Sequence, residues 1–190
     1  MVAFQKKEVY MAVREFEFIF KPARAFKRHR TMSIKSIIVH SSDGRKAGDI
    51  ATLTGDKVSS HWYVTRAGEI FHFVDDEDTA FHAGRVNDSK FSNSASIGIE
   101  QEHFDPDKKH PGGEDWPDIQ IQKVANICAF LFQKHSLSKG SIKSHGEVAF
   151  PKGRKVDPVN YPFEKLFQHI DEAMNDDVVA VNVNGEELDE

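Results

Sequence analysis

Short runs of β-branched residues alternate with amphipathic helical segments, and this alternation restricts the fold more than any other feature of the sequence. Residues 34–40, IKSIIVH, have the pattern of a buried strand that ends at a histidine. Residues 59–66 and 69–74 predict two strands joined by a tight turn at Gly68, which together form a hairpin. A further short strand, SIKSH, is expected to end at His145.

Two helices are predicted from the spacing of apolar residues. A helix that begins at Pro117 and Asp118 carries Cys128 on its apolar face, so Cys128 is interpreted as a core residue and not as a nucleophile. Residues 161–174 predict a closing amphipathic helix. Strands and helices intermix along 190 residues, which is the length of one ordinary domain, so we expect an α/β fold with a single core.

The segment SIGIEQEH, residues 96–103, alternates apolar and polar side chains as a strand between two environments does. Ile97 and Ile99 lie on one face of the expected strand, and Glu100 and Glu102 lie on the other. The polar face therefore brings two carboxylates to the same side of the sheet.

Charge and composition argue against two classes of partner. The formal net charge is −5 at pH 7, whereas a nucleic-acid binder needs a basic face. No run of about 18 apolar residues occurs, so we expect no membrane insertion. Cys128 is the only cysteine, and the first residues lack the pattern of a signal peptide. We therefore expect a chain that is made in the cytoplasm with no signal peptide. We also expect the protein to be a monomer.

Two histidines and one aspartate are candidates for a metal site. His40 and His145 each end a β-branched strand, and Asp157 lies in a polar loop that Pro158 stiffens. Two neutral imidazoles and a carboxylate suit zinc, and a site with three protein ligands keeps a fourth position open for chemistry. Spacing alone leaves the site undecided, because any two histidines and an aspartate can be grouped in this way.

Five motifs follow one another in an order that resembles a known family. They are IIVHSSDG, SSHWYVTRAGEIFHFV, FHAGR, SASIGIEQEH and SHGEVAFPKGRKVDP. Their order and approximate separations resemble the type 2 N-acetylmuramoyl-L-alanine amidases, which are relatives of the peptidoglycan recognition proteins. The resemblance covers residues 34–170, nearly the whole chain. It implies a single α/β domain with a central mixed β-sheet flanked by helices, and zinc-dependent hydrolysis of the amide bond between N-acetylmuramic acid and L-alanine in peptidoglycan.

The resemblance also implies the metal ligands and a cation beside them. One zinc ion (Zn2+) per chain would be held by His40, His145 and Asp157. Lys155 matches the family's lysine two residues before the acidic ligand, and its ammonium would stabilise the oxyanion that forms during hydrolysis. The stretch from His145 to Asp157 would then supply one ligand at each end and a catalytic cation between them.

The expected general base is Glu100, which matches the glutamate of the IGIE motif in the family branch that includes the recycling amidases. The other branch uses a tyrosine before the hairpin histidine, where this chain has Ser60. Tyr63 is offset from Ser60 by an odd number of residues, so it points to the opposite face and is interpreted as packing. Glu102 shares the face of Glu100 and is the alternative base.

His82, in the FHAGR motif, would lie beside the cleft, and two interpretations of it are open. Its side chain contacts the glycan or peptide of the substrate, or it shapes a loop. The sequence also departs from the family in two places. The loop between His145 and Lys155 is longer than in common members, and Val159 replaces a glycine. Both departures concern the cleft wall, so they affect the preferred peptide and not the ligands.

Three segments are expected along the chain. Residues 1–33 alternate charged and apolar residues without a motif and are interpreted as an N-terminal arm packed on the domain. Residues 34–176 form the expected amidase catalytic domain. Residues 177–190 carry alternating valines, an Asn-Gly turn signal and an acidic end. This tail is interpreted either as a frayed terminus or as the start of a further, wall-binding module.

Three biological roles are compatible with these residues. A lytic enzyme, such as a phage endolysin or an autolysin, would act on the cell wall after release, and the tail favours this role. A cytosolic amidase would recycle anhydro-muropeptides. A non-catalytic recognition module would bind peptidoglycan fragments, but such a module has no use for Glu100, Lys155 and an open metal site.

Overall fold

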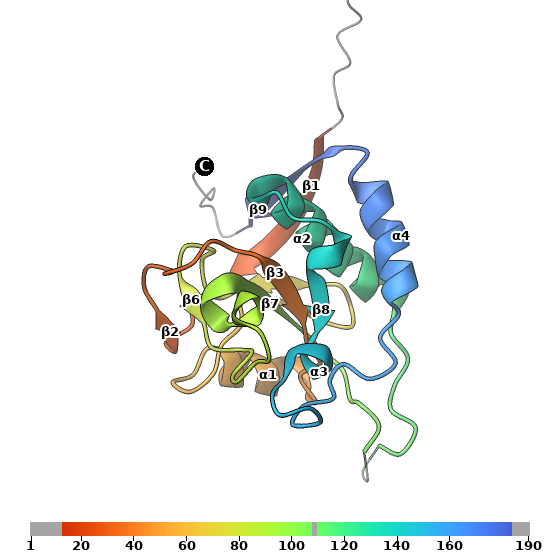
Figure 1. The fold of residues 1–190 in the computed structure, drawn as a ribbon. Helices are drawn as coiled ribbons and strands as arrows, with labels where there is room; N and C mark the ends of the chain where they lie inside the picture. Colours follow the sequence, from red (N-terminus) through yellow and green to blue (C-terminus); the bar gives the residue numbers. More distant parts are fainter. Residues whose placement is uncertain (1–12, 108–109, 184–190) are drawn as a thin grey trace, which may run out of the picture.

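The fold is built on one mixed β-sheet. The computed structural model describes residues 13–107 and 110–183. The strands are β1 (Val13–Phe20), β2 (Phe26–Lys27), β3 (Ser36–Val39), β4 (Trp62–Val64), β5 (Ile70–His72), β6 (Thr79–Ala80), β7 (Ser96–Gln101), β8 (Ile142–Ser144) and β9 (Asp177–Asn182). Seven of them form a sheet in the order β8-β3-β7-β4-β5-β1-β9, while β2 and β6 form a separate pair (Figure 1). Within the seven-stranded sheet, only the expected hairpin of β4 and β5 is antiparallel.

The helices flank this sheet, which confirms the predicted α/β class and mixed sheet. They are α1 (Lys46–Leu53), α2 (Asp118–His135), α3 (His145–Val148) and α4 (Phe163–Ala173), with single 3-10 turns at Ser89–Phe91, Asn93–Ala95 and Lys139–Ser141. α2 and α4 pack against each other (Figure 1). Their apolar faces join Ile97 and Ile99 of β7 in the main core, where Cys128 is fully buried as expected.

The opposite face of the sheet holds a second, smaller apolar cluster. Tyr63 of β4, Phe71 of β5 and Phe73 pack there with Leu53 at the end of α1. Tyr63 is fully buried, as expected for a packing residue. Ser60 lies outside β4, and its hydroxyl donates a hydrogen bond of 2.9 Å to the carbonyl oxygen of Trp62.

Three parallel strands end side by side, and this places the candidate site. Val39 of β3 is in register with Ile99 of β7 and with Ser144 of β8. The residues that follow these three positions are His40, Glu100 and His145. Side chains at the carboxyl ends of neighbouring parallel strands share one edge of a sheet, so the topology brings these three together.

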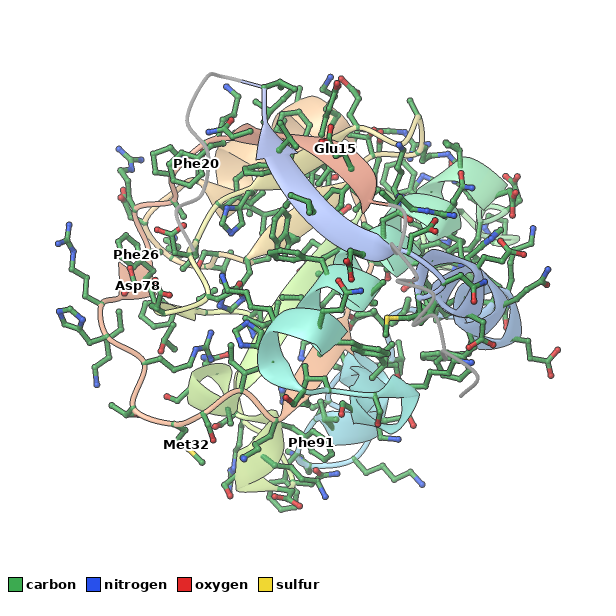
Figure 2. All side chains as sticks on the ribbon, turned by 90° about the horizontal axis from the view of Figure 1, so that it is seen from above. Glu15, Phe20, Phe26, Met32, Asp78 and Phe91 are labelled. Carbon is green, nitrogen blue, oxygen red and sulfur yellow. The ribbon has the colours of Figure 1, made fainter. Side chains whose placement is uncertain are left out.

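The expected boundaries at residues 34 and 176 do not coincide with the edges of the sheet. β1 lies within the expected arm and β9 within the expected tail, and the two strands pair in parallel over six residue pairs. Figure 2, seen from above, shows them crossing the molecule together, with Glu15 and Phe20 labelled on β1. Phe16 and Phe18 are buried while Glu15 and Glu17 are exposed, which is the alternation of a sheet strand. Residues 1–12 and 184–190 of the arm and tail lie outside the described residues.

A chain that ends at Asp176 is therefore expected to be less stable than one that ends at Val183. The shorter chain lacks β9, so it exposes the edge of β1 and loses the buried side chain of Val178. We expect a loss of about 2 kcal/mol from burial and hydrogen bonding. Thermal unfolding would show this as a Tm lower by roughly 4–8 °C. Equal Tm values for the two chains would mean that β9 contributes nothing to the sheet's stability.

No helix within residues 13–107 and 110–183 is long and apolar enough to cross a membrane.

Candidate active site

Three side chains that could hold a metal ion meet beyond the ends of β3 and β8. They are His40, His145 and Asp157, whose ligand atoms all lie within 4.8 Å of one another. The Nδ1 atoms of His40 and His145 are 3.1 Å apart. Asp157 Oδ2 lies 3.1 Å from Nδ1 of His145 and 3.6 Å from Nδ1 of His40. The structure thus brings the three predicted ligands together.

These separations fit a tetrahedral ion. Bonds of about 2.0–2.1 Å from a zinc ion place neighbouring ligand atoms about 3.3 Å apart. The three observed distances of 3.1, 3.1 and 3.6 Å bracket that value. Two imidazole nitrogens and one carboxylate oxygen also belong to the donor types that zinc prefers.

The protonation of these groups suits metal binding. Burial is the main cause that lowers the pKa of His40 to about 4, and the nearby carboxylate of Asp157 opposes it only in part. Burial by itself raises the pKa of Asp157, but its contacts with the rings of His145 and His40 hold that pKa below its usual range. At neutral pH, His40 therefore presents a neutral ring and Asp157 presents a carboxylate, which are the forms that bind metals.

Glu100 lies beside the ligands, with Oε1 at 3.9 Å from Nδ1 of His40. Its Oε2 is buried and has no hydrogen-bond partner among the described residues. Burial is the largest cause that raises the pKa of Glu100 to about 8, and the negative charges of Asp157 and Asp49 act in the same direction. A buried carboxyl group whose pKa is moved toward neutrality is characteristic of a general acid or base.

Both carboxylate oxygens of Glu102, the alternative base, form hydrogen bonds away from the candidate ligands. Its Oε1 accepts a hydrogen bond from the backbone N–H of Lys46 at 3.3 Å, and its Oε2 accepts one from the backbone N–H of Arg66 at 3.0 Å. The first contact lies at the start of α1, and the second lies at the turn of the β4–β5 hairpin. Glu102 thus links the start of α1 to the hairpin turn, while Glu100 faces the candidate ligands.

A cavity of about 500 Å³ opens in front of these groups. Its lining includes five of the six residues predicted for the site, namely His82, Glu100, His145, Lys155 and Asp157. His40 lies behind them and is almost completely buried. Lys155 is exposed on the cavity wall, so its ammonium group can reach a bound molecule.

The ring of His82 lies against the ring of His40, with the ring centres 5.2 Å apart. Its Nδ1 is 3.0 Å from Nε2 of His40, and its Nε2 is 3.2 Å from Oγ of Ser96. A side chain at Gly98 would collide with this ring, because a Cβ there would lie 2.5 Å from its Cγ. Both ring nitrogens thus have partners within the protein, and substrate contact by His82 stays a prediction.

Asp49 is a residue of the cavity that the sequence pattern did not indicate. Its Oδ2 accepts hydrogen bonds of 2.7 Å from Oγ of Ser42 and from the hydroxyl of Tyr63. Burial raises the pKa of Asp49, and its charge contributes to the raised pKa of Glu100. No local signal marks this aspartate, because it lies on the short helix α1 without a motif around it.

Comparisons with solved structures show which proteins share this fold. A selenomethionine derivative of AmpD matches with a TM-score of 0.69 and 21% identity, over 80% of this chain and 94% of that one. The N-acetylmuramyl-L-alanine amidase AmiD from E. coli matches with a TM-score of 0.65 and 25% identity, over 75% of this chain and 60% of that one. The catalytic domain of XlyA matches with a TM-score of 0.58 and 19% identity, over 83% and 99%.

Family membership follows from the sequence. Comparison with curated proteins gives no match. The family model described as N-acetylmuramoyl-L-alanine amidase, however, matches residues 30–160, which is more than half of the chain. This match and the shared fold define an enzyme that acts on amide bonds of peptidoglycan. The chain belongs to the N-acetylmuramoyl-L-alanine amidase family.

Proposed function

We propose that the chain cleaves the amide bond between N-acetylmuramic acid and L-alanine with one zinc ion held by His40, His145 and Asp157. The observation that carries this proposal is the triangle of ligand atoms, 3.1, 3.1 and 3.6 Å on its sides, at the edge of a cavity. Family membership supplies the bond that is cleaved. The close fit of the triangle to tetrahedral bonding supports zinc as the ion.

Glu100 is proposed as the group that moves protons. When bound, zinc acts as a Lewis acid toward the amide carbonyl and makes nearby water more acidic. The positive charge of the bound ion would lower the pKa of Glu100 from its value of about 8 in the metal-free protein. Its carboxylate can then take a proton from the attacking water and return it to the nitrogen of the departing L-alanine. Its position 3.9 Å from a ligand nitrogen supports this role, and so does its free, buried Oε2.

Lys155 is proposed to stabilise the charge that develops on the carbonyl oxygen. Its ammonium group belongs to the wall of the cavity that also contains Glu100 and Asp157. A fixed cation near the developing oxyanion lowers the free energy of the transition state more than that of the substrate. The products are the glycan and a stem peptide with a new amino terminus on L-alanine.

The proposed substrates are soluble anhydro-muropeptides. AmiD was solved with anhydro-N-acetylmuramic acid-L-Ala-D-γ-Glu-L-Lys, which supports fragments of this kind. The valine pattern of the tail is explained by β9 and therefore no longer favours a lytic role. Cleavage of intact cell wall is the second candidate, and the likeness to a mutant endolysin from Bacillus subtilis supports it. The first role would be exercised in the cytoplasm by a monomer, and the second on the cell wall after release.

Product analysis separates these roles. Purified protein is incubated with soluble anhydro-muropeptides and, separately, with whole peptidoglycan, and the released ends are identified by mass spectrometry. We expect new amino termini on L-alanine from the soluble fragments. Release from whole peptidoglycan at a similar rate would favour the lytic role. Cleavage at another bond, or of neither substrate by the zinc-loaded protein, would refute the proposed activity.

A further inference from the structure

We infer that the segment formed by His82 and Ala83 holds a proton on Nε2 of each histidine ligand, and so assigns Nδ1 of each ring to the metal. The inference rests on the proposed function, because it assumes that His40 and His145 are ligands. It gives His82 the task of a positioning residue that acts through His40.

The argument begins at Ser96, a completely buried residue of β7. Its Oγ lies 2.7 Å from the carbonyl oxygen of Ser92 and 3.2 Å from Nε2 of His82. A hydroxyl group has one proton, and a carbonyl oxygen can only accept. The short contact to Ser92 therefore takes the hydroxyl proton, because two oxygens at that distance would otherwise repel. The lone pairs of Ser96 Oγ must then accept a proton from Nε2 of His82.

The proton on Nε2 of His82 determines the state of His40. A neutral imidazole has one N–H, so Nδ1 of His82 is an acceptor. Nε2 of His40 lies 3.0 Å from that acceptor and must carry the proton that joins them. The remaining nitrogen of His40, Nδ1, is then a bare lone pair that faces Asp157 and His145. The hydroxyl of Ser96 thus selects the metal-binding form of His40 through His82.

The adjacent residue has the same effect on the second ligand. Nε2 of His145 lies 3.0 Å from the carbonyl oxygen of Ala83. Because that oxygen can only accept, Nε2 of His145 carries a proton, and Nδ1 is the nitrogen that faces the metal position. Without the ion, a proton on this Nδ1 bridges to Oδ2 of Asp157 at 3.1 Å, and the metal would displace it. Two consecutive residues therefore orient both histidines, one through its side chain and the other through its backbone.

Several contacts hold this segment in place. The side-chain oxygen of Asn93 accepts hydrogen bonds from the backbone N–H groups of His82 at 3.2 Å and of Ala83 at 2.8 Å. Arg154 donates a hydrogen bond of 3.0 Å to the carbonyl oxygen of Ala83, beside His145. Gly98 provides the space for the ring of His82, since any Cβ there would overlap it. The contacts with Asn93, Arg154 and Gly98 thus fix the positions of His82 and Ala83.

The protonated nitrogens can be observed directly in the metal-free full chain. A two-bond nitrogen–proton correlation spectrum at neutral pH separates the two neutral forms of a histidine. The signals of His40 and His145 are assigned as those missing from His40→Gln and His145→Gln. We expect the proton of His40 on Nε2, and we expect Nε2 of His145 to be protonated as well. A proton on Nδ1 of His40 would overturn the inference, whatever the activity of the protein.

Zinc affinity, measured by competition with a chromophoric chelator, tests the role of His82. Leucine and asparagine have the same branched shape, but only asparagine offers an oxygen near the position of Nδ1. His82→Leu is expected to bind zinc about 10–100-fold more weakly than the parent, because groups that hydrogen-bond to ligating histidines have effects of that size. His82→Asn should recover most of this loss. Equal affinities of the two variants would overturn the inference.

A matched pair of serine variants isolates the first hydrogen bond of the chain. Ser36 lies opposite Ser96 in register on β3, is equally buried, and donates a hydrogen bond of 2.8 Å to the carbonyl oxygen of Lys90. Ser96→Ala should weaken zinc binding, whereas Ser36→Ala should not. Equal effects would contradict the inference.

Failure of the inference and failure of the proposed function give different results. Protein with the expected histidine protons but no amidase activity would refute the function and leave the inference standing. If a His82 variant does not fold, the spectrum of the parent chain still decides the question. Amidase activity together with a proton on Nδ1 of His40 would refute the inference alone.

Discussion

Glu100→Gln is expected to lower turnover about 10²–10⁴-fold, the usual contribution of a positioned general base. Glutamine keeps the size of the side chain but cannot take a proton from water. Zinc content should stay near that of the parent, because Glu100 lies 3.9 Å from Nδ1 of His40 and outside the ligand triangle. Turnover of a soluble muropeptide and metal analysis of the same sample measure both quantities.

Glu102→Gln is the matched control on the same strand. The two oxygens of Glu102 already accept hydrogen bonds from the backbone N–H groups of Lys46 and Arg66, so the substitution affects the start of α1 and the hairpin turn and not the cavity. Turnover should remain close to that of the parent. If Glu102→Gln is inactive while Glu100→Gln turns over normally, the assignment of the base is wrong.

Lys155→Ala should also lower turnover with zinc retained, since Lys155 is outside the ligand triangle.

Asp157→Ala is expected to abolish stable zinc binding and, with it, hydrolysis. The substitution removes the carboxylate ligand and leaves two neutral imidazoles to hold a divalent cation. The carboxylate that is removed lies 3.1 and 3.6 Å from Nδ1 of His145 and His40. Metal analysis after gel filtration should find zinc in the parent and little in the variant.

Asp105→Asn controls for the loss of a negative charge from the same cavity. Asp105 also lines the cavity, but it binds the hydroxyl of Ser41 and the backbone N–H of Val159 instead of the ligands. This variant should retain zinc. Chelation of the parent should abolish hydrolysis, and added zinc should restore it, while most of the fold survives because the core does not depend on the ion. Full activity in metal-free protein would refute the zinc proposal.

Local patterns in the sequence were sufficient for most of the elements near the site. The β-branched run before His40 and the alternation in SIGIEQEH correspond to β3 and β7. The helical spacing around Cys128 corresponds to α2, and the hairpin turn at Gly68 joins β4 to β5. These features depend on residues close together in the chain, whose periodicity records which face is buried.

The candidate ligands were predicted by motif, and their convergence depends on topology. His40 and His145 are 105 residues apart, and Asp157 follows His145 by 12. Each histidine comes directly after a strand, but only the adjacency of β3 and β8 in the sheet brings the two rings together. A pattern in the sequence identifies the residue types, while strand order sets the distance between them.

By itself, the sequence determined the α/β class, the main helices and strands, and the set of residues that could bind a metal, because each of these is encoded in local periodicity or a motif. Tertiary structure alone decided the position of β1 and β9 in the central sheet, although the alternation of Phe16 and Phe18 was visible from the start. It also decided the partners of His82 and the place of Asp49 near Glu100. The physical reason is that strand pairing and side-chain hydrogen bonds join residues far apart in the chain, and local periodicity does not specify such partners.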